Sequence, residues 1–178
     1  MSIITLGTMA FDAIETPFGK TDQIVGGSAT YVAYAASHLT KPVMQISIVG
    51  NDFPVEEMKE LEKRGVQLTG VEIVKDKKSF FWSGKYHLDM NTRDTLITDL
   101  NVLADFDPKV PEEYQGSEFL MLGNLMPSLQ ISVINQLRTR PKLIILDTMN
   151  FWMESALDDL KKVLGMIDVL MINDSEAR

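Results

Sequence analysis

The sequence of 178 residues contains no cysteine and only two histidines, His38 and His87. Without cysteine the chain can form no disulfide, zinc–thiolate site, iron–sulfur cluster or thiol nucleophile. Cysteine-free composition is also typical of a reducing compartment, so we expect a cytoplasmic protein. Two isolated histidines offer little from which to build a histidine metal site or a Ser-His-Asp triad, and hydrolase chemistry is therefore disfavoured.

Positive charge and long apolar runs are also scarce. Lys and Arg number 17 against 25 Asp and Glu, which gives a net charge of −8. That balance argues against a protein that holds a nucleic-acid backbone. No apolar stretch approaches the roughly 20 residues of a membrane helix, and residues 1–7 lack the basic segment of a secretory signal. We expect no nucleic-acid partner and no membrane association.

Five short apolar runs alternate with helix-like segments along the chain. The runs are rich in Ile, Val, Leu and Met and too short for free-standing helices, so they indicate buried parallel strands. The alternation predicts the α/β class, with a mainly parallel sheet flanked by helices. The expected strands are residues 3–6, 43–49, 119–122, 143–146 and 169–172, and the expected helices are 29–39, 54–64, 128–137 and 155–164. Gly65, Gly70 and Gly116 are expected to be helix-end or turn glycines.

Two segments interrupt this alternation. Residues 79–88 have a period of two and are followed, after a polar stretch, by a returning run at 95–100, which predicts a hairpin. Turn residues within 11–25 indicate further strands, so we predict a small inserted β lid of about residues 12–25 and 75–100. One face of the hairpin is apolar and needs a cover, either a ligand or its own domain. That face consists of Phe80, Trp82, Tyr86 and Leu88.

Small and polar residues follow each expected strand. Because the carboxyl ends of parallel strands meet at one edge, where α/β sheets bind ligands, these residues indicate a site for a polar ligand. The alternative is that they only cap helices and form turns. They are Asp12, Gly50, Asn51, Asp52, Gly123, Asn124, Asp147, Asn150, Asn173 and Glu176.

Gly26 and Gly27 precede an alanine-rich helix, where paired glycines let a ligand approach free backbone N–H groups. A phosphate-binding Walker A loop is excluded, because Ile14 occupies the position of its first glycine before Gly19. No G-x-G-x-x-G fingerprint occurs, so dinucleotide binding lacks its main support.

Taken in order, these pieces resemble the N-terminal part of the ribokinase-like sugar and nucleoside kinases, the phosphofructokinase-B family. The resemblance runs through the whole chain and implies a ribokinase-like fold with a Rossmann-like core. The matching pieces are the first strand leading to Asp12, the glycine pair of residues 26–33, the Val-Gly-Asn-Asp of residues 49–52, the lid hairpin, residues 147–150, and the Asn-x-x-Glu of Asn173 and Glu176.

The resemblance implies an acceptor side for a sugar or nucleoside. Asp12 would accept hydrogen bonds from substrate hydroxyls, and Gly26 and Gly27 would bring backbone against the sugar. Tyr31, which stands where the family usually has Asn, and Asn124 complete the implied substrate-binding set.

The resemblance also implies ATP and Mg²⁺ as cofactors and phosphorylation of a hydroxyl as the reaction. Asn173 and Glu176 would organise the magnesium and its water network near the phosphates, with Glu176 serving the metal. Phosphoryl transfer consists mostly of positioning and charge neutralisation, which carboxylates at these places suit.

The family's general base lies in a Gly-Ala-Gly-Asp segment of the C-terminal half, so the resemblance implies that this base lies beyond Arg178. We therefore expect residues 1–178 to be an N-terminal portion without a catalytic residue of its own and without the ATP-binding half, inactive by itself. The alternative function is a non-catalytic sugar- or nucleoside-binding module. In either case the lid could pair with another subunit's lid in a homodimer.

Overall fold

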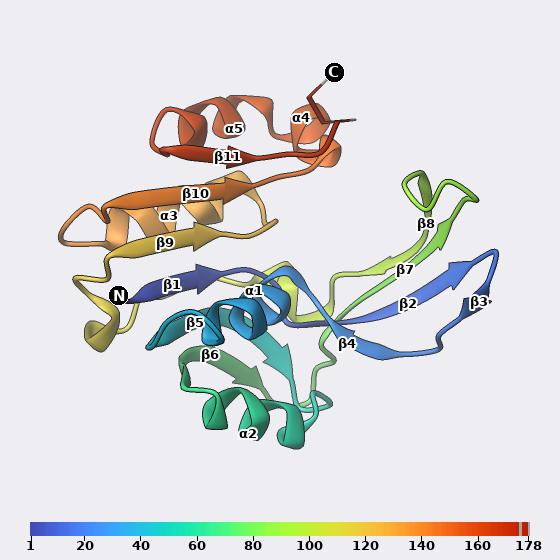
Figure 1. Ribbon diagram of the computed structural model, residues 1–178, viewed down its shortest axis with the longest axis horizontal. Coiled ribbons are helices and arrows are strands. Elements are labelled where there is room, and N and C mark those ends of the chain that lie inside the picture. Colours follow the sequence, from blue (N-terminus) through green and yellow to red (C-terminus); the bar gives the residue numbers. More distant parts are fainter. Residues whose placement is uncertain (175, 178) are drawn as a thin grey trace.

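The computed structural model describes residues 1–174, 176 and 177, which form two β-sheets and the helices that cover one of them (Figure 1). The main sheet has six strands in the order β11-β10-β9-β1-β5-β6, and every neighbouring pair is parallel. The strands are β1 (Ile3–Leu6), β5 (Val43–Gly50), β6 (Val66–Val74), β9 (Phe119–Leu122), β10 (Leu143–Asp147) and β11 (Val169–Met171). Five of the six match the runs expected from the sequence, and the α/β class is confirmed.

The chain runs outward from β1 in both directions, first through β5 and β6 and then through β9, β10 and β11. The direction therefore reverses between β1 and β9. In open α/β sheets ligands bind at the carboxyl ends of the strands beside such a reversal.

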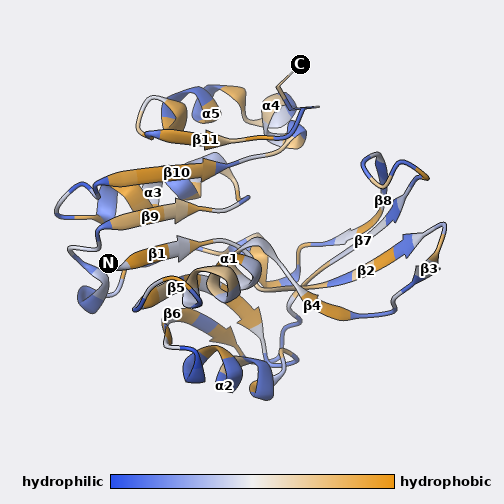
Figure 2. Cartoon of the chain, viewed as in Figure 1, coloured by the Kyte–Doolittle hydropathy of each residue, from blue (hydrophilic) through white to orange (hydrophobic). Residues whose placement is uncertain are grey.

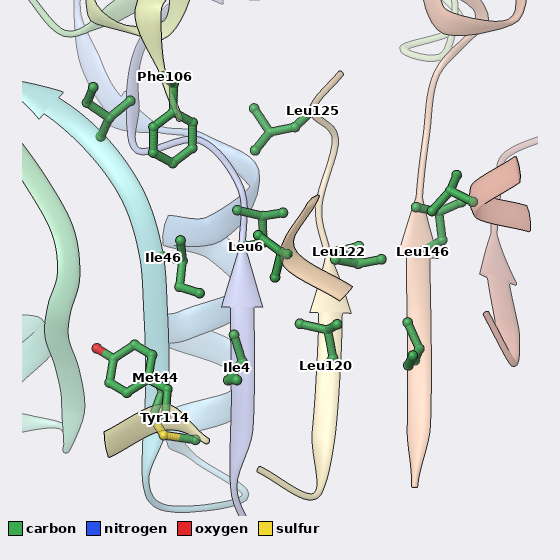
Figure 3. Packing of buried hydrophobic residues seen from close by; sticks show 14 of the residues in the cluster. Ile4, Leu6, Met44, Ile46, Phe106, Tyr114, Leu120, Leu122, Leu125 and Leu146 are labelled. Carbon is green, nitrogen blue, oxygen red and sulfur yellow. The ribbon is translucent and has the colours of Figure 1, made fainter. Parts of the chain in front are cut away.

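Helices cover both faces of the main sheet. One core cluster contains Ala33 and Leu61 together with residues of β5. The other contains Val133 and Leu160 together with residues of β1, β9 and β10. Figure 3 shows the second cluster, with Ile4, Leu6, Leu120, Leu122 and Leu146 on one face of adjacent strands. The helices are α1 (Ser28–Ser37), α2 (Val55–Lys63), α3 (Pro127–Gln136), α4 (Asn150–Ser155) and α5 (Leu157–Leu164), with 3₁₀ turns η1 (Asn101–Asp105) and η2 (Glu112–Tyr114).

The second sheet is the lid, which projects away from the main sheet (Figure 1). Its strands are β2 (Ala10–Thr16), β3 (Gly19–Lys20), β4 (Ile24–Gly26), β7 (Phe80–Tyr86) and β8 (Arg93–Asp99). β2 is central: it pairs parallel with β7 and antiparallel with both β3 and β4, while β7 and β8 form the predicted hairpin. The structure thus has the inserted lid that the sequence predicts.

Five details differ from the expectations. β6 was not expected, and Gly70 lies inside this strand rather than at a turn, because it lets Tyr114 and the Gln45 carbonyl approach closely. α4 is an additional short helix before α5. Asp12 lies within β2 of the lid rather than at the end of a main-sheet strand. Leu88 lies beyond β7 in an exposed turn, so it is no part of the lid face.

Candidate functional site at the base of the lid

The N-terminus of α1 lies beside the carboxyl ends of β1 and β9, where the chain direction reverses. Ser28 exchanges hydrogen bonds with Thr8: its N–H donates to Oγ1 of Thr8 at 3.0 Å, and the Thr8 N–H donates to Oγ of Ser28 at 3.2 Å. Gly7 and Gly123 leave room for this side chain, since an added Cβ would come within 2.5 and 2.7 Å of its Oγ. These contacts fix the start of α1 at the edge where a ligand is expected.

Asp12 lies against the two glycines that precede α1. A Cβ added at Gly26 would come within 2.0 Å of Oδ2 of Asp12, so only glycine leaves space for the carboxylate. The pairing of Asp12 with Ile24 across β2 and β4 creates this proximity. Gly27 has a φ of 97°, and an added Cβ would come within 2.3 Å of the Thr8 carbonyl oxygen. The predicted site residues Asp12, Gly26 and Gly27 are therefore brought together.

The Asp12 carboxylate is partly buried, and its surroundings have two opposing effects on its pKa. Burial raises the pKa of Asp12, and a hydrogen bond from the Gly27 N–H opposes that rise. Few groups neutralise the charge, so a hydroxyl that donates to the carboxylate would restore part of its lost hydration. This environment suits an acceptor for substrate hydroxyls.

Tyr31 belongs to the same group, although its side chain is 54% exposed. Its hydroxyl oxygen lies 3.3 Å from the position of a Cβ added at Gly26. Burial, the Asp12 charge and Tyr86 all raise the pKa of the Tyr31 phenol, in that order of size. The phenol thus stays protonated and can donate a hydrogen bond beside Asp12.

Asn124 lies in a different group, at the end of β9. Its Oδ1 accepts a hydrogen bond from Nε1 of Trp152 at 2.7 Å, and its Nδ2 lies 3.0 Å from Sδ of Met149. Its backbone N–H donates to the Asp147 carboxylate. The side chain is thus engaged by residues that follow β10, and its role in substrate binding stays a prediction.

Asn173 and Glu176 follow β11 and bind each other. The Asn173 N–H and Nδ2 donate to the Glu176 carboxylate at 3.0 and 2.7 Å, and the Glu176 N–H donates to Oδ1 of Asn173 at 3.0 Å. This exchange gives the Asn-x-x-Glu motif a local structure.

Two residues at this end of the chain lie outside the described residues. They are Ser175, within the motif, and Arg178, beyond which the general base is expected. The described residues therefore do not test where that base lies, and its place beyond Arg178 stays a prediction.

Asp147 joins the group of Asn173 and Glu176, although the sequence indicates no role for it beyond its place after a strand. Burial raises the pKa of Asp147 most, and the negative charge of Glu176 raises it further. A divalent cation would relieve the repulsion between two such carboxylates, and Mg²⁺ prefers oxygen ligands and retains several waters. The residues therefore fit Mg²⁺ through one or two carboxylates, although the described part of the chain gathers no cluster of three acidic or histidine side chains.

The surface of the described residues includes the following two hollows. One, of about 370 Å³, is formed by β2, β3 and the turn between them and is lined by Ile14, Thr16 and Phe18. The larger, of about 600 Å³, lies along β6 and α2, on the far side of β5 from β1. Of these two, the first is on the strand that carries Asp12.

Comparison with known proteins identifies the family of the chain. Residues 3–178 match the model of the family described as pfkB family carbohydrate kinase. The chain belongs to this family.

Among curated proteins, the cytidine kinase of Thermococcus kodakarensis is 23% identical to this pfkB-family chain over 185 residues, which cover 99% of this chain and 63% of the relative. Among solved structures, the nucleoside kinase of Methanocaldococcus jannaschii, described as an archaeal member of the ribokinase family, has a TM-score of 0.76 at 15% identity. The nucleoside kinase of Burkholderia thailandensis in complex with inosine has a TM-score of 0.77 at 16% identity. Each structural alignment covers 98% of this chain and 61% of the solved one.

These likenesses confirm the ribokinase-like fold. The pfkB-family chain spans slightly more than three-fifths of the length of the relatives it matches. None of the described helices has the length and apolarity needed to cross a membrane.

Proposed function

We propose that the protein to which this chain belongs transfers the γ-phosphoryl group of ATP to a hydroxyl of a small sugar or nucleoside. Residues 1–178 supply the acceptor side and the lid, and the general base and most of the ATP site come from beyond Arg178. The observation that carries the proposal is the approach of the Asp12 carboxylate to the glycine pair, with the Tyr31 hydroxyl beside it.

The geometry supports a separate role for each group of residues. Asp12 holds and orients a substrate hydroxyl, and Tyr31 can donate to a neighbouring oxygen. The lid above them excludes water, which would otherwise accept the phosphoryl group. Asp147 and Glu176, with Asn173, would hold magnesium, whose charge neutralises that of the phosphates when it is bound.

The relatives support the nucleoside side of this proposal. The curated relative is named a cytidine kinase, and both solved neighbours are nucleoside kinases, one of them with inosine bound. The family description, a carbohydrate kinase, supports the same chemistry with a hydroxylated acceptor.

Asp12→Ala in the complete protein tests the proposal. Loss of a hydrogen bond to a charged group costs about 1.5–3 kcal/mol, so we expect acceptor affinity to fall by about 10- to 100-fold. ATP affinity should stay nearly unchanged, because the carboxylate contacts the acceptor side alone. Isothermal titration calorimetry with nucleosides, ribose and ATP measures both quantities.

Asp22→Ala is the matched control, because it removes an exposed carboxylate from the loop between β3 and β4 of the same lid. Its acceptor affinity should equal that of the parent protein. Equal acceptor affinity in Asp12→Ala and the parent would overturn the role of Asp12. If the complete protein binds the acceptor tightly but transfers no phosphate, its function would instead be that of the non-catalytic binding module.

A homodimer through the lids stays a prediction. Sedimentation of a Trp82→Ser variant addresses it, because an unchanged mass in solution would show that this face is no dimer contact.

A further inference from the structure

Trp82 lies across Gly84 on the lid. A Cβ added at Gly84 would come within 2.1 Å of Cη2, 2.4 Å of Cζ2 and 2.9 Å of Cζ3 of Trp82. The six-membered part of the indole therefore occupies the space that any other residue at position 84 would fill. A glycine inside a strand costs stability, and here it makes room for a ring to lie along the sheet.

The indole is on the same face of the lid as Asp12. In the parallel pairing of β2 with β7, Asp12 is the register partner of Trp82, and Ile14 is the partner of Gly84. Register partners on neighbouring strands project to the same side, and the strands lie about 4.8 Å apart. The ring thus extends from beside Asp12 towards the hollow that Ile14 helps to line.

The surroundings hold the indole in this position. Nε1 of Trp82 donates to Oγ1 of Thr95 at 3.3 Å, and Thr95 is the partner of Gly84 across the hairpin. On the opposite face, Phe81 and Phe11 pack into the core cluster of β5 and α2. The root of β7 is therefore anchored, while the Trp82 side remains partly exposed.

We propose that Trp82 is the platform on which the base of a nucleoside stacks while the ribose hydroxyls bind Asp12. The inference rests on the proposed function and narrows its substrate class from sugars in general to nucleosides. The lid backbone at Gly84 covers one side of the indole, and the Trp82 side chain stays partly exposed, as a ring that receives a base requires. Every nucleobase has a π-face, so stacking tolerates purines and pyrimidines alike.

The other aromatic side chains around Asp12 fit the same occupant. Tyr31 is near enough to both Asp12 and Tyr86 for each to raise the pKa of its phenol. Aromatic side chains beside a single carboxylate suit a ligand with one planar apolar part and one hydroxylated part. A free pentose has only the second part.

The test compares Trp82→Ala, Trp82→Leu and Trp82→Phe in the complete protein, each with cytidine, inosine and ribose in calorimetric titrations. We expect the alanine and leucine variants to lose about 10- to 100-fold in affinity for both nucleosides, as removal of a stacking aromatic does, and less than about 2-fold for ribose. Phenylalanine should restore most of the nucleoside affinity, because it keeps a π-face that leucine lacks. Near-ultraviolet circular dichroism and thermal melting check that each variant is folded.

Leu88→Ala is the matched control for a lost apolar lid side chain, because Leu88 is 77% exposed in the turn after β7 and lies outside the lid face. It should bind all three ligands as the parent does. Equal losses for ribose and nucleosides in Trp82→Ala would place the sugar ring, not the base, on the indole and overturn the inference. Unchanged nucleoside affinity in Trp82→Ala would overturn it too, and the proposed function would survive if Asp12→Ala still lost binding. A parent protein that binds and phosphorylates none of the three ligands would instead count against the proposed function itself.

Discussion

The two sheets of this molecule differ most clearly in one strand of each. All eight residues of β5 in the main sheet are buried, whereas all seven residues of β8 in the lid are exposed. Figure 2 shows a similar contrast, with mostly hydrophobic strands in the main sheet and strands of mixed hydropathy in the lid. Helices thus cover most of the main sheet, although β11 is exposed along its length. The lid packs against the core at its root, where Phe11 contacts Phe53.

This difference separates stability from recognition. Elements with few buried apolar contacts open at low free-energy cost, and binding segments are drawn from them. The main sheet should therefore set the free energy of unfolding, and the lid should set the affinity for the acceptor. Five substitutions test that division, from the largest expected change in the protein to the smallest.

The greatest change is expected in the main sheet. Leu122 on β9 is 0% exposed within the larger core cluster, so Leu122→Ala should lower the free energy of unfolding by about 3 kcal/mol through the cavity it leaves. Ile97→Ala on β8, where the side chain is 47% exposed, should cost less than about 0.5 kcal/mol. Urea unfolding of the complete protein measures both. Equal costs would show that the lid belongs to the cooperative core.

The next effect is expected in the lid. Gly84→Ala adds a methyl group where the Trp82 ring lies, so the indole must rotate away. We expect about a 10-fold loss of nucleoside affinity, about 1.4 kcal/mol, with little change in the urea midpoint. The same change made in Trp82→Ala should have no further effect, because the ring it displaces is gone. Additive losses in this double-mutant cycle would contradict the contact.

A smaller effect is expected at the boundary of the two sheets. Burial raises the pKa of Asp12, so this carboxyl binds its proton more tightly in the folded than in the unfolded state. Its contribution therefore favours folding at low pH and is lost as pH rises through the folded pKa. Asp12→Asn, which carries no charge, should be more stable than the parent near pH 7.

The excess stability of Asp12→Asn should disappear below the unfolded pKa of Asp, about 3.9. Thermal melting of both proteins from about pH 3 to about pH 8 measures the difference on both sides of that pKa. A difference that grows towards low pH would show that the charged form of Asp12 is stabilised, not penalised, by its site. The substitution should also weaken acceptor binding, which separates the two roles of the carboxylate.

The least change is expected on the outside of the lid. Lys85 and Glu15 form an ion pair at 2.7 Å between β7 and β2, and both side chains are largely exposed. Exposed pairs gain little, because water and salt screen them. Lys85→Ala should leave the melting temperature and the nucleoside affinity within measurement error. A clear loss of either would mean that the outer lid face contributes more than the comparison of the two sheets implies.

Local patterns were enough to predict most of the fold. Apolar runs located five main-sheet strands closely, because a buried parallel strand needs hydrophobic residues on both faces. The expectation of burial was wrong for β11, which is an edge strand and is exposed along its length. The sequence analysis missed β6 because its apolar residues form no continuous run. Val66 is buried and Leu68 is partly buried, while Gln67, Thr69 and Glu72 are exposed. Its weak alternation was the available signal, and Gly70 inside it suggested a turn.

The glycine pair, Asp12 and the Asn-x-x-Glu motif could be named from the sequence because their spacing along the chain matches a family pattern. Trp82 was predicted to be on the apolar face of the lid without a role of its own. Asp147 was noticed as a polar residue after a strand and as part of the family pattern at residues 147–150, but without a role of its own. Their partners come from other segments, which no periodicity reveals.

The sequence by itself determined most of the strands, the place of the lid in the chain and the candidate site residues. These features follow from local hydrophobic periods and motifs. Folding in three dimensions selects which of the candidates meet. Asp12 reaches Gly26 because β4 folds back on β2, and Asn124 is engaged by Trp152 of α4. Strand register and loop return are set by contacts between distant segments, and those contacts exist only once the chain has folded.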